Sequence, residues 1–315
     1  MNKIFLKYKG GLMLLLTALI WGIAFLFQKN SMNYIGPFTF TSFRGLIAAS
    51  ILIPFSFISD KCKQNKNIEN GIIDYKTEII GGILSGLFLF LGSSLQQYSL
   101  VYTSVSKGGF LTSTYMVFVP ILGLLLKKKT SLKNWLCVTG ALIGSYILTC
   151  FEAMISGESF LPNFSDFILI LSSTCFAMQI LMVDRFVSKC NPVRLNGYSF
   201  FWVFVYSGIV ALFSEKFTFD NFGKYIGGLL FVGILSSCIA YSFQNIGQKY
   251  VNPTTSSLIL SLESVFALLS GVIFLKEELS IYEIIGCAII FICVVISQVS
   301  LPIKFKGKEE NRCLQ

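Results

Sequence analysis

Ten stretches of about 20 predominantly apolar residues follow one another along this 315-residue chain. A helix needs about 20 such residues to cross a hydrocarbon core of about 30 Å, because it rises about 1.5 Å per residue. The candidate spans are 10–28, 37–58, 78–98, 104–126, 134–151, 164–183, 196–213, 225–247, 254–275 and 281–300. They are too long and too uniformly apolar for transmembrane β-strands, which alternate over about ten residues. The sequence therefore predicts an all-α integral membrane protein with ten transmembrane helices.

Charge is scarce in this chain, and its distribution follows the predicted spans. Only 13% of the residues are charged, whereas soluble domains usually carry about 25%. With the N-terminus inside, most of the 25 Lys and Arg residues lie in inner segments. The exceptions are Lys29, Lys216, Lys224 and Lys276 in outer segments, and Arg44 and Lys107 within spans. Because Lys and Arg concentrate in cytoplasmic loops, we predict a multi-pass protein of the cytoplasmic membrane with both termini in the cytoplasm.

Residue patterns that would indicate an enzyme or a cofactor are missing from the sequence. It contains no His, and its nine Cys form no C-x-x-C pair, so we expect no metal and no cofactor. It has no phosphate-binding loop and no nucleophile elbow, so we do not expect an enzyme. The net charge of +9 follows from the topology, and we expect no nucleic-acid partner.

A faint internal repeat divides the chain. Gly36-Pro37 before the second span corresponds to Asn191-Pro192 before the seventh. Ser94–Gln97 near the end of the third span corresponds to Ser242–Asn245 near the end of the eighth. We therefore predict a first five-helix repeat at 10–151, a second at 164–300, and a cytoplasmic tail at 301–315.

Five is an odd number, so the second repeat must enter the membrane from the opposite face. Inverted repeats recur in secondary transporters, which hold their substrate near the midplane between the two halves. The inverted repeat therefore favours a transporter. The alternative is gene duplication in a membrane protein without a transport function, because duplication alone leaves the same repeat in the sequence.

Several motifs resemble the drug/metabolite transporter superfamily, in its ten-helix, EamA-type branch. They are Trp21-Gly22 in the first span, Pro37 with Ser42-Phe43-Arg44 in the second, Tyr102–Val105, Gln248–Thr254 and Ser261–Ala267. The resemblance covers about 10–300 and implies transport of amino acids, amines, nucleotide-linked metabolites or toxic compounds, often outward. The chain departs from the pattern at Ser264, where relatives often have Pro, so the resemblance implies a weaker kink there.

Glu263 is the most informative single residue. It lies about nine residues, or about 14 Å, into the ninth span, close to the midplane. A carboxylate at that depth costs several kcal/mol unless it is paired, protonated or facing water. We interpret Glu263 as a proton site or a contact for a substrate cation. A carboxyl group that only packs helices together is the alternative.

Two basic residues also lie within predicted spans. Arg44 is about 10 Å from the outer end of the second span, and a structural or gate contact explains it better than substrate binding. Lys107 lies just inside the outer end of the fourth span and precedes Gly108-Gly109. In one interpretation, Lys107 lies at a loosened helix start, lines an outer vestibule and attracts an anion. In the other, which is slightly favoured, its side chain extends to the outer membrane interface.

Amide and aromatic side chains complete the candidate site. Gln96 and Gln97 in the third span and Gln244 and Asn245 in the eighth occupy corresponding places, so they are expected near opposite mouths of a pathway. Amides donate and accept hydrogen bonds, which suits a polar substrate or, equally, contacts between helices. Trp21 and Tyr115 lie in the middle of their spans and are candidates for cavity lining or for simple packing.

Together these observations predict a secondary transporter that moves a small polar, amino-acid-like metabolite, with export favoured by the resemblance and proton coupling through Glu263 as a hypothesis. A lipid flippase or scramblase is the main alternative, and it would need a polar groove open to lipid. A membrane-embedded enzyme is less favoured, since it would need a cluster of catalytic side chains. The expected partners are a small-molecule substrate and the bilayer, in a monomer or a homodimer.

Overall fold

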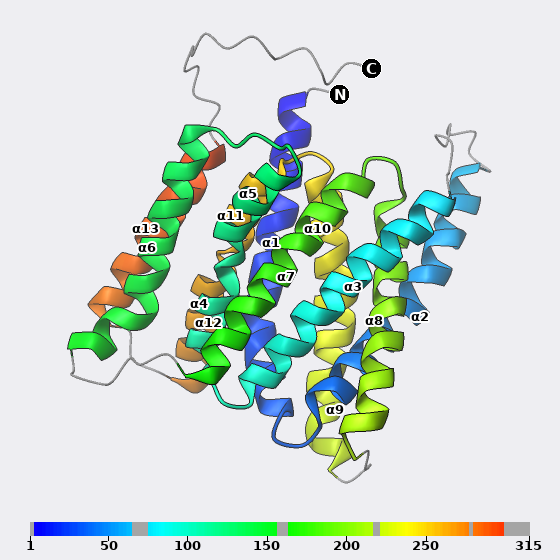
Figure 1. Cartoon of the computed structure of the whole chain (residues 1–315), viewed down its shortest axis with the longest axis horizontal. Coiled ribbons are helices and arrows are strands. Elements are labelled where there is room, and N and C mark those ends of the chain that lie inside the picture. The colour runs from blue at the N-terminus through cyan, green and yellow to red at the C-terminus, as the bar shows by residue number, and fades with distance from the viewer. Residues whose placement is uncertain (1–2, 65–74, 156–162, 217–220, 277–279, 299–315) are drawn as a thin grey trace.

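The computed structural model describes residues 3–64, 75–155, 163–216, 221–276 and 280–298, and these residues contain helices and no strand. Seven of the described helices are unbroken (Figure 1): α1 (Lys3–Ser31), α2 (Pro37–Gln64), α3 (Tyr75–Leu100), α6 (Leu132–Ile155), α7 (Phe164–Phe186), α8 (Pro192–Ser214) and α13 (Ile281–Gln298). Three further crossings consist of consecutive pieces. These are α4 (Val105–Ser113) with α5 (Tyr115–Leu125); α9 (Phe222–Leu230), η1 (Phe231–Ala240) and α10 (Tyr241–Gln248); and α11 (Pro253–Leu260), α12 (Glu263–Ser270) and η2 (Gly271–Leu275).

The predicted all-α membrane fold is confirmed. Among the described residues, nine helical crossings are long and apolar enough to span a membrane, and the remaining predicted span, 134–151, lies within α6. One boundary differs clearly, because α2 continues to Gln64 instead of ending near 58. The side chain of Asp60 in this added stretch is held by Arg194, which stabilises the extra turns. The predicted tail, 301–315, and the last two residues of the predicted tenth span lie outside the described residues.

The helices lie in a row of packed pairs. The α6–α13 pair forms one side of the molecule, α2 and α8 with α3 form the other, and α1, α7 and α10 lie between them (Figure 1). The chain starts and α13 ends at the same end of the molecule, at the top of Figure 1, which we call the inner end. Since each half contributes five crossings, corresponding helices of the two halves run in opposite directions.

Small residues allow some of these helices to approach closely. At the crossing of α6 and α13, a Cβ atom added to Gly286 would lie 2.6 Å from the carbonyl oxygen of Gly144 and 2.6 Å from the backbone nitrogen of Leu148. No such atom fits there, so glycine is required. Close backbone contact is a main source of attraction between helices in a bilayer, where lipid tails are as apolar as the helices themselves.

Each half of the protein caps a helix of the other half. At the outer end, the carboxylate of Glu215 accepts hydrogen bonds from the backbone nitrogens of Phe38 and Thr39, both at 2.8 Å, at the start of α2. At the inner end, Glu78 accepts a hydrogen bond of 2.8 Å from the backbone nitrogen of Asn191, just before α8. Helix N-termini carry partial positive charge, which explains why both caps are carboxylates. The two halves are therefore tied together at both ends of the α2–α8 pair.

A buried cluster of charges surrounds the cap at the inner end. The guanidinium of Arg194 is fully buried and donates to Glu78 from Nε at 2.6 Å and from Nη2 at 3.0 Å. Its Nη1 donates to Asp60 at 2.6 Å. The rings of Phe57 and Tyr75 flank the guanidinium, with centroids 5.0 and 5.1 Å from its central carbon. This cluster joins α2, α3 and α8, and it was not predicted from the sequence.

Candidate functional site

Two of the crossings are interrupted near their middles by hydroxyl side chains. Between α4 and α5, the hydroxyl of Thr114 donates to the carbonyl of Leu111 at 2.6 Å. Between α11 and α12, the hydroxyls of Ser261 and Ser264 donate to carbonyls three residues earlier, at 2.8 and 2.9 Å. Hydroxyls that bond the preceding turn in this way bend helices. The helix is therefore interrupted beside Ser264 although the proline of the family motif is missing.

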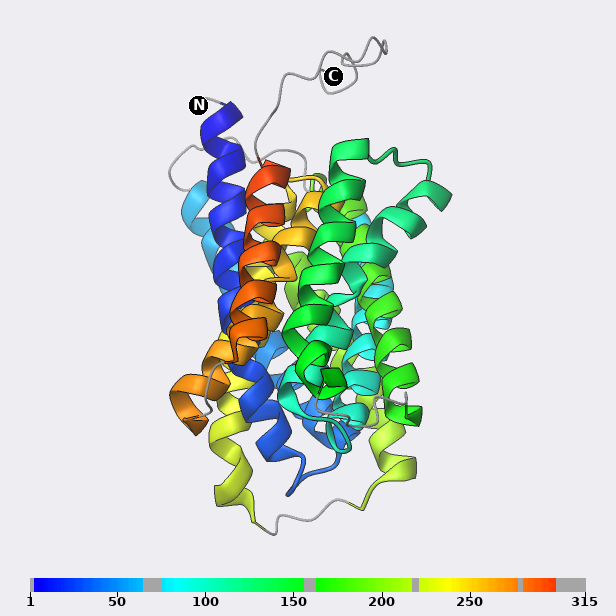
Figure 2. The same ribbon diagram turned by 90° about the vertical axis from the view of Figure 1, so that its left-hand side faces the viewer.

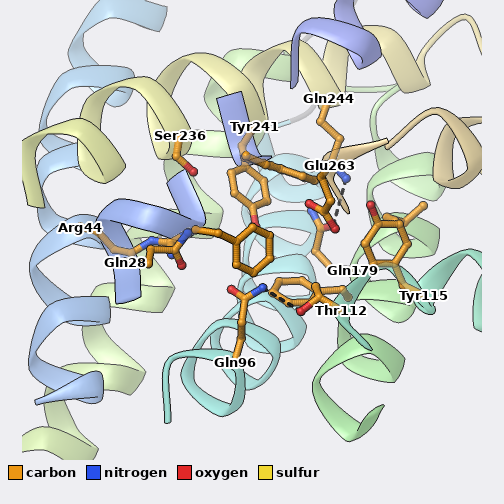
Figure 3. A pocket seen from close by; sticks show the side chains of 14 residues that line it. Gln28, Arg44, Gln96, Thr112, Tyr115, Gln179, Ser236, Tyr241, Gln244 and Glu263 are labelled. Atoms are coloured by element: carbon orange, nitrogen blue, oxygen red, sulfur yellow. Dashed lines mark hydrogen bonds between the residues drawn. The ribbon is translucent and has the colours of Figure 1, made fainter. Parts of the chain in front are cut away.

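A small enclosed cavity lies where these interrupted helices meet (Figure 3). It is lined by Trp21, Phe25, Gln28, Arg44, Gln96, Thr112, Tyr115, Phe176, Gln179, Ile180, Ser236, Tyr241, Gln244 and Glu263. All of these except Trp21 are at most 7% exposed. The volume that the centre of a water molecule can occupy in this cavity is about 30 Å³, which is room for about two waters. A metabolite therefore fits only if the surrounding helices move apart.

Glu263 begins α12 and points into this cavity. It is 3% exposed. The hydroxyl of Tyr115, at the start of α5, lies within electrostatic reach of its carboxyl group. Neither that hydroxyl nor Glu263 Oε1 has a hydrogen-bond partner of ordinary geometry among the described residues. The carboxyl group thus keeps an acceptor unused inside the protein, which is costly unless a ligand, water or a proton satisfies it.

A guanidinium faces the cavity from the other side. Arg44 is 2% exposed, and its Nε donates to the hydroxyl of Ser237 at 3.2 Å. Figure 3 shows Arg44 and Glu263 on opposite sides of the cavity, with Tyr241 between them. Tyr241 interacts electrostatically with both groups. The cavity therefore has a guanidinium on one wall and a carboxyl group on the other, an arrangement that the sequence alone did not reveal.

Aromatic rings separate the guanidinium from the carboxyl group. The rings of Trp21 and Tyr241 lie 4.6 Å apart between centroids, and the ring of Phe200 packs edge-on against Tyr241 at 5.2 Å. The indole nitrogen of Trp21 has no hydrogen-bond partner among the described residues. The rings offer a ligand apolar surface, and the indole offers a donor.

The predicted amide residues fall into two groups. Gln96 lines the cavity and donates to Thr112 at 3.2 Å, and Gln244 lines it and donates to Gln179 at 3.1 Å. Gln97 and Asn245 lie outside the lining of this cavity. Gln97 donates to Gln28, and Asn245 donates to the carbonyl of Pro192 at 3.1 Å. In each half, an amide of the third crossing thus bonds a glutamine of the first crossing, Gln28 or Gln179.

Lys107 lies outside the cavity lining, in an ion pair with Asp166 at 2.7 Å. The less favoured interpretation, a loosened helix start, is wrong, since α4 begins at Val105 and Ser104 caps it by accepting from the backbone nitrogen of Lys107. A second ion pair, between Lys128 and Asp184, joins the same two crossings near the inner end. The α4–α5 crossing is therefore tied to α7 near both of its ends.

A second, open pocket lies at the inner end beside Lys128. It is lined by Val119, Gly123, Lys128, Lys129, Thr130, Ser131, Asn134, Leu181, Asn252, Pro253 and Thr254, and it offers about 350 Å³ to the centre of a water molecule. Burial and the nearby charge of Arg185 lower the pKa of Lys128. Val119 of this pocket lies four residues after Tyr115 of the central cavity, and Leu181 directly follows Ile180. At most about one helical turn therefore separates the inner pocket from the cavity.

Sequence reasoning missed several of the residues that gather here. Tyr241 lies three residues before Gln244, which places both on one face of α10, so helical spacing was an available signal. Gln28 and Gln179 were not missed, since the sequence offers both as weaker amide candidates, and they are 151 residues apart, close to the offset of the repeat. The pairing of Asp166 and Asp184 with lysines of another crossing had no signal in the sequence, since it depends on how the helices pack.

Comparisons with known proteins identify the family and support the fold. A model of the EamA-like transporter family matches residues 8–150 and 163–298. An uncharacterized transporter of Archaeoglobus fulgidus is 30% identical over 304 residues, covering 93% of this chain and 90% of the relative. The uncharacterized transporter YyaM of Bacillus subtilis is 22% identical over 305 residues, covering 95% and 97%. One solved crystal structure superposes with a TM-score of 0.70 at 15% identity, over 91% of this chain and 96% of that one, and it supports the fold alone.

Proposed function

This chain belongs to the EamA-like transporter family and is a multi-pass membrane transporter, and on that premise we propose that it is a secondary carrier for a small, amino-acid-like metabolite. The substrate binds in the central cavity and crosses by alternating access. The inner end faces the cytoplasm, as the distribution of Lys and Arg predicts, and the membrane is the cytoplasmic membrane. The favoured direction is export, which rests on the family resemblance alone.

The observation that carries this proposal is that a guanidinium, Arg44, and a carboxyl group, Glu263, face one another across the cavity. An amino acid carries an ammonium and a carboxylate separated by a short distance. Glu263 offers an acceptor to the ammonium, and Arg44 offers a planar donor fork to the carboxylate. Gln96 and Gln244 add neutral donors and acceptors, so a polar ligand leaves few groups unpaired. The aromatic rings between the two groups suit an apolar side chain.

The interrupted helices support alternating access. Transporters built from inverted repeats commonly bind their substrate where helices are discontinuous near the midplane. Here the central cavity is lined by buried side chains and is too small for a metabolite. The inner pocket, about one turn away, is lined in part by the exposed residues Lys129 and Ser131. Opening the last turn between them, at Val119 and Leu181, would connect the cavity with the inner end.

Proton coupling is a further part of the proposal and rests on Glu263. A lone carboxyl group without a cation beside it is stabilised by taking up a proton or by binding a cationic substrate. Competition between the two would couple transport to the proton gradient. In proteoliposomes, we expect the Glu263→Gln variant to lose uptake driven by a pH gradient. Uptake at the wild-type rate would contradict the coupling.

The binding proposal is tested by thermal unfolding of the purified protein with a panel of amino acids, amines, nucleosides and carboxylates. A ligand at 100 times its Kd stabilises the folded state by about 2.7 kcal/mol. We expect hits among amino acids, lost in Glu263→Gln and Arg44→Met and kept in Glu283→Gln. Glu283 lies in the first turn of α13 and does not line the cavity, so it serves as the control.

The matching amine without its carboxylate adds a second comparison. It should bind more weakly than the amino acid and should be insensitive to Arg44→Met, because it has no group for the guanidinium. Binding that is equal in Glu263→Gln and in Glu283→Gln would contradict the assignment of the cavity. If no ligand in the panel binds and labelled lipids equilibrate across vesicles, the flippase or scramblase alternative is favoured instead.

A further inference from the structure

The middle piece of the eighth crossing, η1, is wound as a π-helix, in which backbone N–H groups bond carbonyls five residues earlier instead of four. Figure 2 shows α9 (yellow-green) beginning this crossing at the outer end of the molecule, at the bottom of the view. With 10 residues, η1 is long, because π-helices are mostly single turns, which are frequent at functional sites. A π-helix of this length needs contacts that stabilise it.

The last turn of η1 shows which contact stabilises the wider winding. The backbone nitrogen of Tyr241 donates to the carbonyl of Ser236, five residues earlier. In an α-helix it would donate to the carbonyl of Ser237, which therefore loses its usual partner here. The side-chain nitrogen of Asn196, on α8, donates to that carbonyl instead at 3.1 Å, and it also donates to the hydroxyl of Ser242 at 3.1 Å. Asn196 is buried, and both hydrogens of its amide are used on this crossing.

The π-helical winding also decides which side chains reach the central cavity. Ser236 and Tyr241 both line it (Figure 3). At 3.6 residues per turn, two residues five apart would point about 140° away from one another. Hydrogen bonds between residues five apart place them on the same face instead. An α-helical η1 would therefore turn Ser236 away from the face that carries Tyr241.

The residue that Asn196 holds is also the hydrogen-bond partner of Arg44. Nε of Arg44 donates to the hydroxyl of Ser237 at 3.2 Å, and Ser237 is fully buried. The ring of Phe200 lies 5.9 Å from the central carbon of the guanidinium. Phe200 follows Asn196 by four residues, which places both on one face of α8. This face therefore contacts Arg44 directly through Phe200 and indirectly through Asn196 and Ser237.

We propose that Asn196 is a positioning residue for substrate recognition. It holds η1 in the π-helical winding, which brings Ser237 to Arg44 and points the guanidinium at the carboxylate of the ligand. This role rests on the proposed function and adds to it a residue outside the lining of the cavity. A ligand with a carboxylate depends on Asn196, whereas the matching amine, which has no group for Arg44, does not. A purely structural Asn196 would affect both ligands equally.

Nuclear magnetic resonance of arginine side chains tests the position of Arg44 without a substrate. The chain has four arginines, so protein labelled with [15N]arginine gives few Nε–H signals, and the one lost in Arg44→Met belongs to Arg44. Asn196→Leu removes the donors but keeps the number of side-chain atoms, and we expect it to shift this signal and to speed exchange of its hydrogen. Ser199→Ala is the matched control and should leave the signal unchanged. Ser199 is also buried on α8, but it bonds Leu195 and Ser85 instead of η1.

Ligand affinity from thermal unfolding supplies the second measurement. We expect Asn196→Leu to weaken binding of the amino acid by about tenfold or more, since a hydrogen bond to a charged group contributes about that factor. Binding of the amine should stay unchanged. Ser237→Ala removes the hydroxyl beside Arg44 but keeps the carbonyl that Asn196 bonds. It should give the same selective loss, and it tests the contact even if Asn196→Leu does not fold.

Two results would overturn the proposal. One is an Arg44 signal that stays in place in Ser237→Ala or in folded Asn196→Leu. The other is an equal loss of affinity for the amino acid and for the amine. A shifted Arg44 signal in a protein that binds no amino acid would refute the proposed substrate instead, and it would support the role of Asn196 in placing Arg44.

Discussion

Replacing Arg194 by Met is expected to be one of the most destabilising single changes outside the central cavity. The guanidinium is fully buried and makes three charged hydrogen bonds of 2.6–3.0 Å, two to Glu78 and one to Asp60. Met keeps an unbranched apolar stem against the rings of Phe57 and Tyr75. The substitution therefore removes the charge and the hydrogen bonds while it retains much of the packing.

The magnitude follows from the burial of the two carboxylates that remain. The side chain of Glu78 is 1% exposed, so its charge has no access to water once Arg194 is gone. Asp60 is 14% exposed and keeps some hydration. Breaking a buried ion pair on one side typically costs about 3–5 kcal/mol, and we expect a loss in that range. Replacing the unpaired carboxylate of Glu78 by a neutral amide should recover part of the lost stability. The double variant Arg194→Met/Glu78→Gln should therefore be about 1–3 kcal/mol more stable than Arg194→Met.

Unfolding by SDS in mixed micelles, followed by circular dichroism, measures these differences. Arg185→Met is the control, because Arg185 is exposed at the inner end of α7, and its loss should cost less than about 0.5 kcal/mol. A loss below about 1 kcal/mol for Arg194→Met would refute the reasoning. A double variant less stable than Arg194→Met would also refute it, since no stranded charge would then need relief.

Three further predictions concern contacts between helices. Gly286→Ala places a methyl group 2.6 Å from the carbonyl oxygen of Gly144 and should cost about 1–3 kcal/mol in the same titration. Ligand affinity should not change, because α6 and α13 do not line the central cavity. Glu215→Ala removes the cap of α2 and should cost about 1–2 kcal/mol; an unchanged unfolding curve would mean that solvent replaces the cap. Asp184→Asn breaks a partly exposed pair with Lys128 and should cost no more than about 1 kcal/mol, yet it should speed hydrogen exchange at 120–131.

The depth of Glu263 in the membrane could be predicted from the sequence by counting helical residues. Its depth follows from nine residues of helix, and the structure places it in a central cavity as the carboxylate expected there. For Arg44, counting predicted the depth but not the direction in which its side chain points. Its depth was equally clear, but the expected structural or gate role did not anticipate a charge that faces Glu263 across the cavity. The depth of a residue in the membrane depends on its distance along the sequence from the end of the span. The direction in which the Arg44 side chain points depends on the rotation of α2 about its axis, and the packing of α2 against α8 determines that rotation.

The partners in ion pairs could not be predicted from the sequence either, as Lys107, Asp60 and Glu78 show. The sequence placed all three near the ends of spans, where contact with water is the simplest expectation. The structure instead pairs Lys107 with Asp166, and Asp60 and Glu78 with Arg194. These partners lie 59, 134 and 116 residues apart along the chain. Opposite charges attract wherever the fold brings them together, and no local pattern records that.

The sequence by itself determined the number of helices, their all-α class, the inverted order of the halves and the predicted side of each loop. It could do so because a bilayer forces every backbone group to be satisfied within its own helix, so apolar runs translate directly into crossings. Only the tertiary structure decided which side chains share the central cavity, which charges pair and where helices are interrupted. Those features depend on helix rotation and close packing between segments far apart in the chain, where glycine contacts such as Gly286 against Gly144 set the distances.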